Sequence, residues 1–428
     1  MKKIKENFKK AKKRVKDFFV KRDEEIKIEN ERETKLVGFR LLEVVVLISI
    51  ATIIGVFSGS FLTYNFVKGN DKIDKSSSTY INEFEEAYQN VLDNYYEDVD
   101  KGKLIDAAIN GMLSTLDGYT SYINADETEQ FNERMEGEYQ GIGIEFTTAT
   151  GYVHTITGVM EGSPALEAGL IKGDTIVKVD ALDASTKTGT EIASYIKGKN
   201  ISEITMIVKR DGKEVTINIK KSLIQLPSVT KRTFDKNGKK VGYVSVSLFA
   251  NNTYSQFKTA VTALESEGIT SLVIDVRNNS GGYLHAADDM LELFLSKGDI
   301  MYKMQDKTGT IPFDDKTDEK RTYLVVLLIN GYSASASEVI AAAFNEVYGA
   351  QLVGTTSYGK GTVQQPSDLT NGGMIKVTTD KWLTPKGNWI DKVGLKPTTE
   401  VELGDAYITN PTDENDTQLQ KALELLAK

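Results

Sequence analysis

The sequence predicts an α/β protein of several domains that one N-terminal helix holds in a membrane. Three observations support this prediction. Residues 44–67 form one uncharged apolar run, residues 137–222 alternate short strands with glycine turns, and apolar strands alternate with helices from Leu223 onward. The last pattern is typical of an α/β layout around a buried sheet. A chain of 428 residues is long enough for two or three domains.

The apolar run Val44–Val67 is a predicted transmembrane helix. Its 24 residues carry no charge, and a helix of that length crosses a hydrocarbon layer roughly 30 Å thick. Residues 1–43 contain 15 Lys and Arg against 9 Asp and Glu, and basic flanks stay on the cytoplasmic side. We therefore expect a cytoplasmic leader (1–43), an uncleaved single-pass anchor in the cell membrane, and an extracytoplasmic body. A buried helix of a soluble domain is the alternative for this run.

The composition excludes several kinds of site. The chain has no cysteine and two histidines, His154 and His285, so disulfides, thiolate metal sites and a cysteine nucleophile are excluded. A Ser–His–Asp triad would need one of those two histidines as its base. We expect no metal site and no cofactor. The net charge is −9 although the leader is basic, so the body is strongly acidic and nucleic acid is not an expected partner.

A polar tether and a helical region follow the anchor. Residues 68–78 (KGNDKIDKSSS) have few apolar side chains. Residues 79–136 carry apolar side chains at helical spacing, among them Ile81, Phe84 and Tyr88. A glycine and an LDGY turn divide this region into two or three helices. We expect a homodimer contact here.

Residues 137–222 are predicted to form a small β-rich domain. The sequence GIGI, at Gly141, Ile142, Gly143 and Ile144, precedes a short strand, and GSPALEAGL, GDTIVKVD and a hairpin signal follow. Together these motifs resemble a PDZ domain. The resemblance implies that N–H groups of the glycine loop hold a peptide's terminal carboxylate while the peptide adds to the sheet edge. The two isoleucines suggest an apolar pocket beside the loop, although GIGI alone is equally compatible with an ordinary turn.

Residues 223–403 are predicted to form an α/β core, on which residues 404–428 pack. Two strands of this core end in sequences of functional interest. One runs into RNNSGG, where glycines such as Gly281 let backbone N–H groups approach a ligand. The other runs into NGYSASASE, where Ser335 and Glu338 also have the spacing of a helix capping box. A tight turn and a helix cap are the structural alternatives at these two places.

A third segment, SYGKGTVQ, places Lys360 between two glycines. If the residues after it are extended, Lys360, Thr362 and Gln364 share one face, because side chains repeat every two residues. The Gln364 amide could then orient the lysine amine. A solvated loop lysine is the alternative.

These motifs, in this order, resemble the carboxy-terminal processing (tail-specific) proteases. The markers are AINGMLSTLDGYTSY, EGEYQGIG, the PDZ-like motifs, VGYVSVSLF, LVIDVRNNSGG, NGYSASASE, GKGTVQ and LTPKGNWI, from about Tyr80 to the C-terminus. The resemblance implies a serine endopeptidase with a crotonase-like ββα core and a Ser–Lys dyad. It implies Ser335 as nucleophile, Lys360 as general base and Gln364 as the residue that orients it. It also implies an oxyanion hole made by the backbone N–H groups of Gly281 and Ser335.

Two positions depart from the family pattern. Ser280 replaces the usual proline of the NPGG turn, and Gly118 replaces the proline of LDP. Neither belongs to the dyad. Asp275 and Arg277 lie in the same motif as Gly281 and are interpreted as structural.

The resemblance leads to a specific hypothesis and one rival. A lysine base must be neutral although its unperturbed pKa is about 10.4, so we expect Lys360 to be desolvated with no carboxylate beside it.

The hypothesis is a membrane-anchored peptidase that cleaves membrane-associated or secreted proteins, with the PDZ domain reading free C-termini and gating activity. The rival is a membrane-tethered PDZ scaffold with an inactive core.

Overall fold

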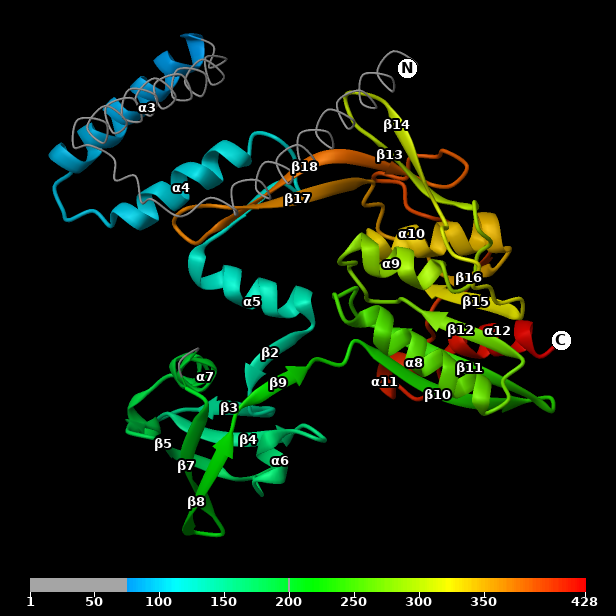
Figure 1. The fold of residues 1–428 in the computed structure, drawn as a ribbon, viewed down its shortest axis with the longest axis horizontal. Helices are drawn as coiled ribbons and strands as arrows, with labels where there is room; N and C mark the ends of the chain where they lie inside the picture. The colour runs from blue at the N-terminus through cyan, green and yellow to red at the C-terminus, as the bar shows by residue number, and fades with distance from the viewer. Residues whose placement is uncertain (1–74, 199–200) are drawn as a thin grey trace, which may run out of the picture. The chain divides into compact units, whose positions relative to one another are not determined.

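The computed structural model describes residues 75–198 and 201–428, which fall into two compact units. The first unit, ending at Val99, contains helix α3 (Lys75–Asn94); the second, Asp100–Lys428, contains all other described elements (Figure 1). The predicted leader and the predicted anchor at residues 44–67 lie outside the described residues. Within the described ranges, no helix is both long enough and apolar enough to cross a bilayer.

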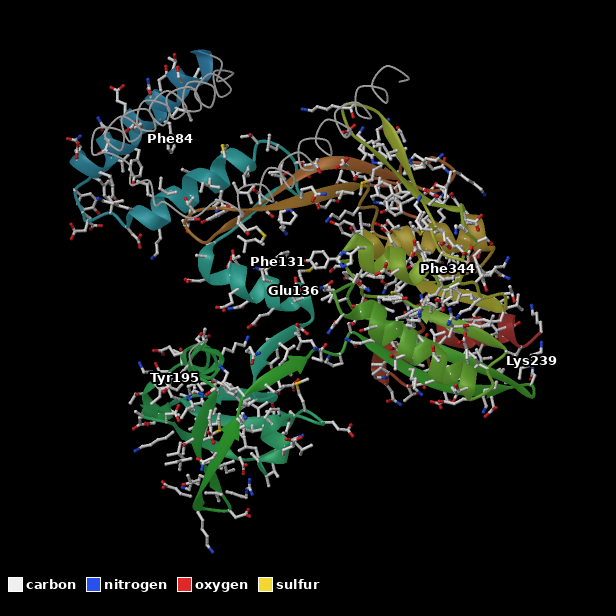
Figure 2. All side chains as sticks on the ribbon, viewed as in Figure 1. Phe84, Phe131, Glu136, Tyr195, Lys239 and Phe344 are labelled. Atoms are coloured by element: carbon white, nitrogen blue, oxygen red, sulfur yellow. The ribbon has the colours of Figure 1, made fainter. Side chains whose placement is uncertain are left out.

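Helix α3 presents large apolar side chains to its surroundings. Tyr80, Ile81 and Phe84 are all exposed, and Phe84 is labelled in Figure 2. They recur at the spacing of one helical face, as the sequence predicted.

The second unit begins with two helices and a short strand. Helix α4 (Lys101–Leu113) starts at the N-cap Asp100, whose side chain accepts a hydrogen bond from the amide of Lys103. Strand β1 (Ser121–Ile123) and helix α5 (Ala125–Glu136) follow. The short strand interrupts a region for which the sequence predicted helices alone.

A β-rich domain follows, as the sequence predicted. Its sheet has the order β3-β4-β5-β7-β8, with β6 paired to β5, so β3 is an edge strand. Ile142, Ile156 and Met206 are among the fully buried side chains of its own core. The chain enters and leaves the domain through the antiparallel pair β2–β9 (Figure 1). The elements are β2 (Glu138–Gly141), β3 (Ile144–Ala149), β4 (Val153–Val159), α6 (Pro164–Glu167), β5 (Thr175–Val179), β6 (Leu182–Asp183), a 3₁₀ turn (Ala184–Thr186), α7 (Gly189–Lys197), β7 (Glu203–Arg210), β8 (Lys213–Lys220) and β9 (Ser222–Gln225).

The remaining chain builds a layered α/β core. Its main sheet has the order β10-β11-β12-β15-β16-β19, and every neighbouring pair except β10–β11 is parallel. Leu272 and Ile274 of β12 pack in the cluster shared with helices α8, α9 and α10, whereas Val273 packs in the cluster shared with α12. Helices therefore cover both faces of the sheet (Figure 1). The elements are β10 (Val229–Lys236), β11 (Lys239–Val246), α8 (Thr253–Ser266), β12 (Ser271–Asp275), α9 (Leu284–Leu291), β15 (Leu324–Ile329), α10 (Ala336–Ala343), a π-helical turn (Phe344–Tyr348), β16 (Gln351–Gly354), β19 (Thr399–Glu400), α11 (Asp405–Thr409) and α12 (Thr417–Leu426).

A second sheet joins segments from distant parts of the chain. Its order is β1-β18-β13-β14, and β17 also pairs with β18. Strand β1 precedes the β-rich domain, yet Tyr122 of β1 lies opposite Ile375 of β18. Residues on both sides of that domain in the sequence therefore meet in one sheet. The strands are β13 (Ile300–Gln305), β14 (Thr310–Asp314), β17 (Thr362–Asp368) and β18 (Met374–Leu383).

Candidate active site

Ser335 lies on a strained turn between strand β15 and helix α10. Its backbone angles are φ 57° and ψ −118°, a combination that a residue with a side chain rarely adopts. Strain of this kind persists only where the surrounding structure imposes it, and it is concentrated at functional sites. A sharp strand-to-helix turn is also how a nucleophilic serine is presented in many hydrolases.

The flanking serines of the SASAS sequence have structural roles. Ser333 and Ser337 are fully buried, and their hydroxyls donate at 2.8 Å to the carbonyl oxygens of Val276 and Asn279. Ser335 between them is only partly buried. Among the three serines, Ser335 therefore offers the accessible hydroxyl, and its role as nucleophile stays a prediction.

The Glu338 carboxylate joins the serine turn to the lysine loop. Its Oε2 accepts from the amide N–H groups of both Ser335 and Lys360, each at 2.9 Å. Its Oε1 accepts from the amide of Gly359 at 2.7 Å and from the Ser357 hydroxyl at 2.5 Å. Glu338 has no exposed surface, and its burial raises the pKa of the carboxyl while these donors lower it. The predicted capping carboxylate therefore also holds together the two segments that carry the predicted dyad.

Gly281 lies directly against Ser335. A Cβ added to Gly281 would come within 2.8 Å of the Ser335 Cβ and 2.9 Å of the Ala334 carbonyl oxygen, and φ at Gly281 is 105°. Only glycine fits this approach. The Gly281 N–H donates to Asn279 Oδ1 at 2.9 Å, and the Ser335 N–H donates to Glu338. The two predicted oxyanion donors are thus adjacent, but both are engaged, and a substrate oxygen would have to replace their present acceptors.

Both tryptophans of the protein hold the backbone of the Lys360–Gly361 segment. Trp382 donates from Nε1 to the Lys360 carbonyl at 2.7 Å, and Trp389 donates to the Gly361 carbonyl at 2.9 Å. Burial lowers the pKa of Lys360, and the positive charge of Lys376 lowers it further. The predicted desolvation is therefore found.

The expectation of a carboxylate-free surrounding for Lys360 is wrong. The charges of Glu338 and Asp117 both act to raise the pKa of Lys360, against the effects of burial and of Lys376. The sequence predicted Glu338 only as a helix cap. Its spacing from Ser335 does not show that the same carboxylate also accepts from the amides of Gly359 and Lys360. It missed Asp117 because that residue is more than 240 positions away in the chain.

Comparison with known proteins decides the family. Residues 240–401 match the model of peptidase family S41, residues 58–128 match the N-terminal domain of the activating protease CtpB, and residues 140–220 match a PDZ domain. The carboxy-terminal processing protease CtpB of Bacillus subtilis (strain 168) is 35% identical over 349 residues, covering 81% of this chain and 72% of that protein. This chain belongs to the carboxy-terminal processing proteases.

Other relatives have similar names. The carboxy-terminal processing protease CtpA of Bacillus subtilis (strain 168) is 32% identical, covering 79% of this chain and 74% of the relative. Among solved structures, a photosystem II D1 C-terminal processing protease is 24% identical with a TM-score of 0.45, covering 81% of this chain and 96% of that one. The protein is a serine-type endopeptidase with a PDZ domain and an S41 peptidase core.

In the described part of this protease, Gln364 makes no hydrogen bond to the Lys360 amine. Its Nε2 donates instead to Thr362 Oγ1 at 3.0 Å and to Thr378 Oγ1 at 3.1 Å. Thr362 and Gln364 share a face, as the sequence predicted, although a register shift in the β17–β18 pair separates Val363 from Gln364. The orienting role of Gln364 stays a prediction.

The predicted PDZ loop occupies the start of the β-rich sheet. Gly141 ends β2 and Ile144 begins β3, while Ile142 is 1% exposed in the domain core. Gly143 has φ 78°, and an added Cβ there would lie 2.4 Å from the Ser163 Cβ. Ile144 lines a groove of about 940 Å³ between β3, α7 and α5, whereas Ile142 does not. Of the two isoleucines, only Ile144 is placed where the expected apolar pocket would be.

Proposed function

We propose that this protease is a membrane-anchored, extracytoplasmic endopeptidase that uses Ser335 as nucleophile and Lys360 as general base. The observation that carries the proposal is the Glu338 carboxylate, one oxygen of which accepts from the backbone N–H groups of both residues. The strained backbone of Ser335 and the desolvation of Lys360 support the same assignment.

The proposed chemistry requires a neutral Lys360 amine within reach of the Ser335 hydroxyl, and the lowered pKa of Lys360 favours that neutral state. Ser335 Oγ bonds to the scissile carbonyl carbon while its proton moves to the Lys360 amine. The tetrahedral intermediate collapses, the C–N bond breaks, and the leaving amine takes the proton from the Lys360 ammonium. Water then attacks the acyl carbon of the ester and gives a proton to Lys360. The bond between the acyl carbon and Ser335 Oγ breaks, the product leaves with a new C-terminal carboxyl group, and Lys360 returns the proton to Ser335 Oγ. To stabilise the oxyanion, the N–H groups of Gly281 and Ser335 must leave their present acceptors and donate to the substrate oxygen. One such donor typically contributes about 10²–10³ in rate.

The PDZ domain is proposed to read the C-termini of substrates or regulators and to gate the core. Its edge strand β3 has one free side, so an extended peptide can add there. The groove of about 940 Å³ lies along β3 and α7. An apolar terminal side chain would pack against Ile144 and Phe146 in this groove, while the terminal carboxylate would lie at the loop of Gly143, which does not line the groove. A tenfold activation would need about 1.4 kcal/mol of differential affinity for the open state.

The first unit is proposed to supply the anchor and a homodimer contact. Residues 44–67 would cross the membrane once with the N-terminus inside the cell. The exposed side chains of Tyr80, Ile81 and Phe84 on α3 are the apolar surface on which a second copy would pack. Protease added outside intact cells should digest the body and spare the leader; protection of the body would reverse the orientation.

The test is cleavage by the full-length protein in detergent. Candidate membrane-associated proteins should be cut by the wild type and left intact by Ser335→Ala. A reporter peptide should be cut faster with a non-cleavable peptide ending in an apolar residue than with its C-terminally amidated form. Equal cleavage by Ser335→Ala would overturn the nucleophile. No cleavage by either protein would favour the PDZ scaffold.

A further inference from the structure

A loop outside the matched peptidase segment reaches the candidate active site. The S41 match covers residues 240–401, whereas the loop between α4 and β1 (residues 114–120) precedes the PDZ domain. Pairing of β1 with β18 places the loop beside the core, with Ser121 opposite Lys376. The amide of Thr378 also donates to Thr120 Oγ1 at 3.1 Å. The loop is thus fixed to the strand that borders the lysine.

Tyr119 in this loop covers the Lys360 amine. The Lys360 Nζ lies 5.2 Å from the centroid of the Tyr119 ring. Tyr119 is itself partly buried, and its burial together with the neighbouring Tyr358 phenol raises the pKa of Tyr119 to about 12. The phenol therefore stays neutral over the pH range in which a peptidase works, and it presents an aromatic face to the amine.

The same loop reaches the side chain of Gln364. Thr120 Oγ1 lies 3.3 Å from Thr378 Oγ1, which accepts the Gln364 amide at 3.1 Å. The conformation of the loop is fixed from within, because Asp117 accepts from the amides of Tyr119 and Thr120 at 2.7 and 2.8 Å. One short loop therefore contacts the predicted base and, through one threonine, the residue predicted to orient it.

We propose that Tyr119 is a positioning residue for the general base: its ring shields the Lys360 amine from water, so the active site is complete only when this loop is docked on β18. The inference rests on the proposed role of Lys360. It assigns a function in catalysis to a loop within the helical region that precedes the PDZ domain.

The direction of the expected effect follows from what sets the pKa of Lys360. Burial and Lys376 lower its pKa, whereas Glu338 and Asp117 raise it. Removing the ring would admit water and stabilise the ammonium, which raises the pKa. It would also remove a cation–π attraction of about 0.5–1 kcal/mol, which acts in the opposite direction. Because burial is the largest influence on Lys360, the net effect should be upward.

The test is the pH dependence of covalent labelling of Ser335 by a fluorophosphonate, which requires no knowledge of the substrate. The full-length protein in detergent is labelled between pH 6 and pH 10. For Tyr119→Ala the rising limb should shift upward by about one pH unit, which is about tenfold slower labelling below the midpoint. Tyr119→Phe keeps the ring and should restore the wild-type profile. Tyr407→Ala, at a partly buried tyrosine of α11, is the matched control and should not differ from wild type.

An unshifted midpoint in Tyr119→Ala overturns the proposal. If that variant does not fold, as judged by circular dichroism, Tyr119→Ser replaces it, because serine also removes the bulk that shields the amine from water. An unshifted midpoint there is equally decisive. If the wild type is labelled and the pH midpoint of labelling is the same in the Tyr119 variants, Tyr119 has no role in positioning the base, and the proposed function still stands. Absence of labelling in the wild type would overturn both.

Discussion

At the scale of single residues, Lys360 shows how opposing influences set the state of a base. Its burial and the charge of Lys376 favour the neutral amine, while Glu338 and Asp117 favour the ammonium. Glu338 is needed for the structure of the site, because its oxygens accept hydrogen bonds from four donors on two segments. The site therefore tolerates a nearby negative charge and offsets it by desolvation.

Lys360→Arg tests the identity of the base. Guanidinium is not deprotonated in proteins, so the variant keeps a positive charge but cannot accept the serine proton. We expect kcat/KM for a cleaved peptide to fall by about 10²–10⁴, the usual contribution of a general base. Lys231→Arg, at an exposed lysine of β10, is the control and should retain full activity. Retained activity in Lys360→Arg would point to another base, and His285 would be the first to examine.

Glu338→Gln tests the bridge between the two segments. The amide keeps the shape but replaces one acceptor oxygen with an NH₂ group, which would face hydrogen-bond donors. An unsatisfied buried donor costs about 1–3 kcal/mol, so urea unfolding should show a loss of that size together with at least a tenfold fall in kcat/KM. Glu346→Gln is a matched control, because that carboxylate also accepts a backbone N–H, from Lys386, but near the surface. Equal behaviour of the two variants would argue against the bridge.

The sequence identified some residues of the site and missed others for a physical reason. Ser335, Lys360 and Gly281 lie in short motifs whose strand ends and glycines are visible locally. Tyr119 and Thr120 reach the site only through the β1–β18 pairing, which joins positions more than 250 residues apart. No local pattern contains that pairing.

At the scale of elements, Arg277 attaches helix α12 to the central sheet. Its guanidinium pairs with Asp275 at 2.6 Å and with Asp416 at 2.8 Å, and all three side chains are almost fully buried. The structural interpretation of Asp275 and Arg277 agrees with these contacts. Arg277→Ala would leave two buried carboxylates without their cationic partner, although Asp275 and Asp416 would keep the donors Tyr243 Oη and Leu419 N–H. Removing one partner of a buried ion pair typically costs about 3–5 kcal/mol.

The matched control for Arg277 is an exposed pair on the same sheet. Arg232 pairs with Asp413 at 2.5 Å, with both side chains more than a third exposed. Surface pairs contribute about 0–1 kcal/mol, so chemical denaturation of Arg232→Ala should show a much smaller loss of unfolding free energy. Similar losses in the two variants would mean that Arg277 is not the anchor of α12.

Helix α9 contains a buried carboxyl that should make stability depend on pH. Burial raises the pKa of Asp288 to about 7, and its Oδ1 has no hydrogen-bond partner among the described residues. The unfolded chain binds fewer protons than the folded chain between pH 4 and pH 7, so the contribution of Asp288 to stability declines as the pH rises through that window. Asp288→Asn should flatten the dependence of Tm on pH between pH 4 and pH 7, whereas Asp318→Asn, at an exposed position, should not. An equally steep dependence in Asp288→Asn would refute the assignment.

At the scale of the whole molecule, the sequence predicted the order of the domains but not the sheet that segments before and after the PDZ domain share. The hydrophobic patterns predicted the α/β core and the PDZ-like domain, because strand and helix periodicity are local properties. The second sheet was not predicted, since β1 and β18 lie on opposite sides of the PDZ domain in the chain. This arrangement means that a segment before the PDZ domain and a segment after it meet beside Lys360.

The central claim is that Ser335 is a nucleophile activated by Lys360, and covalent mapping tests it most directly. The full-length protein in detergent is treated with a fluorophosphonate, digested, and analysed by mass spectrometry. We predict a single adduct on the peptide that contains Ser335, absent in Ser335→Ala and at least about 10²-fold slower to form in Lys360→Arg. An adduct on another residue, or labelling of Lys360→Arg at the wild-type rate, would contradict the account.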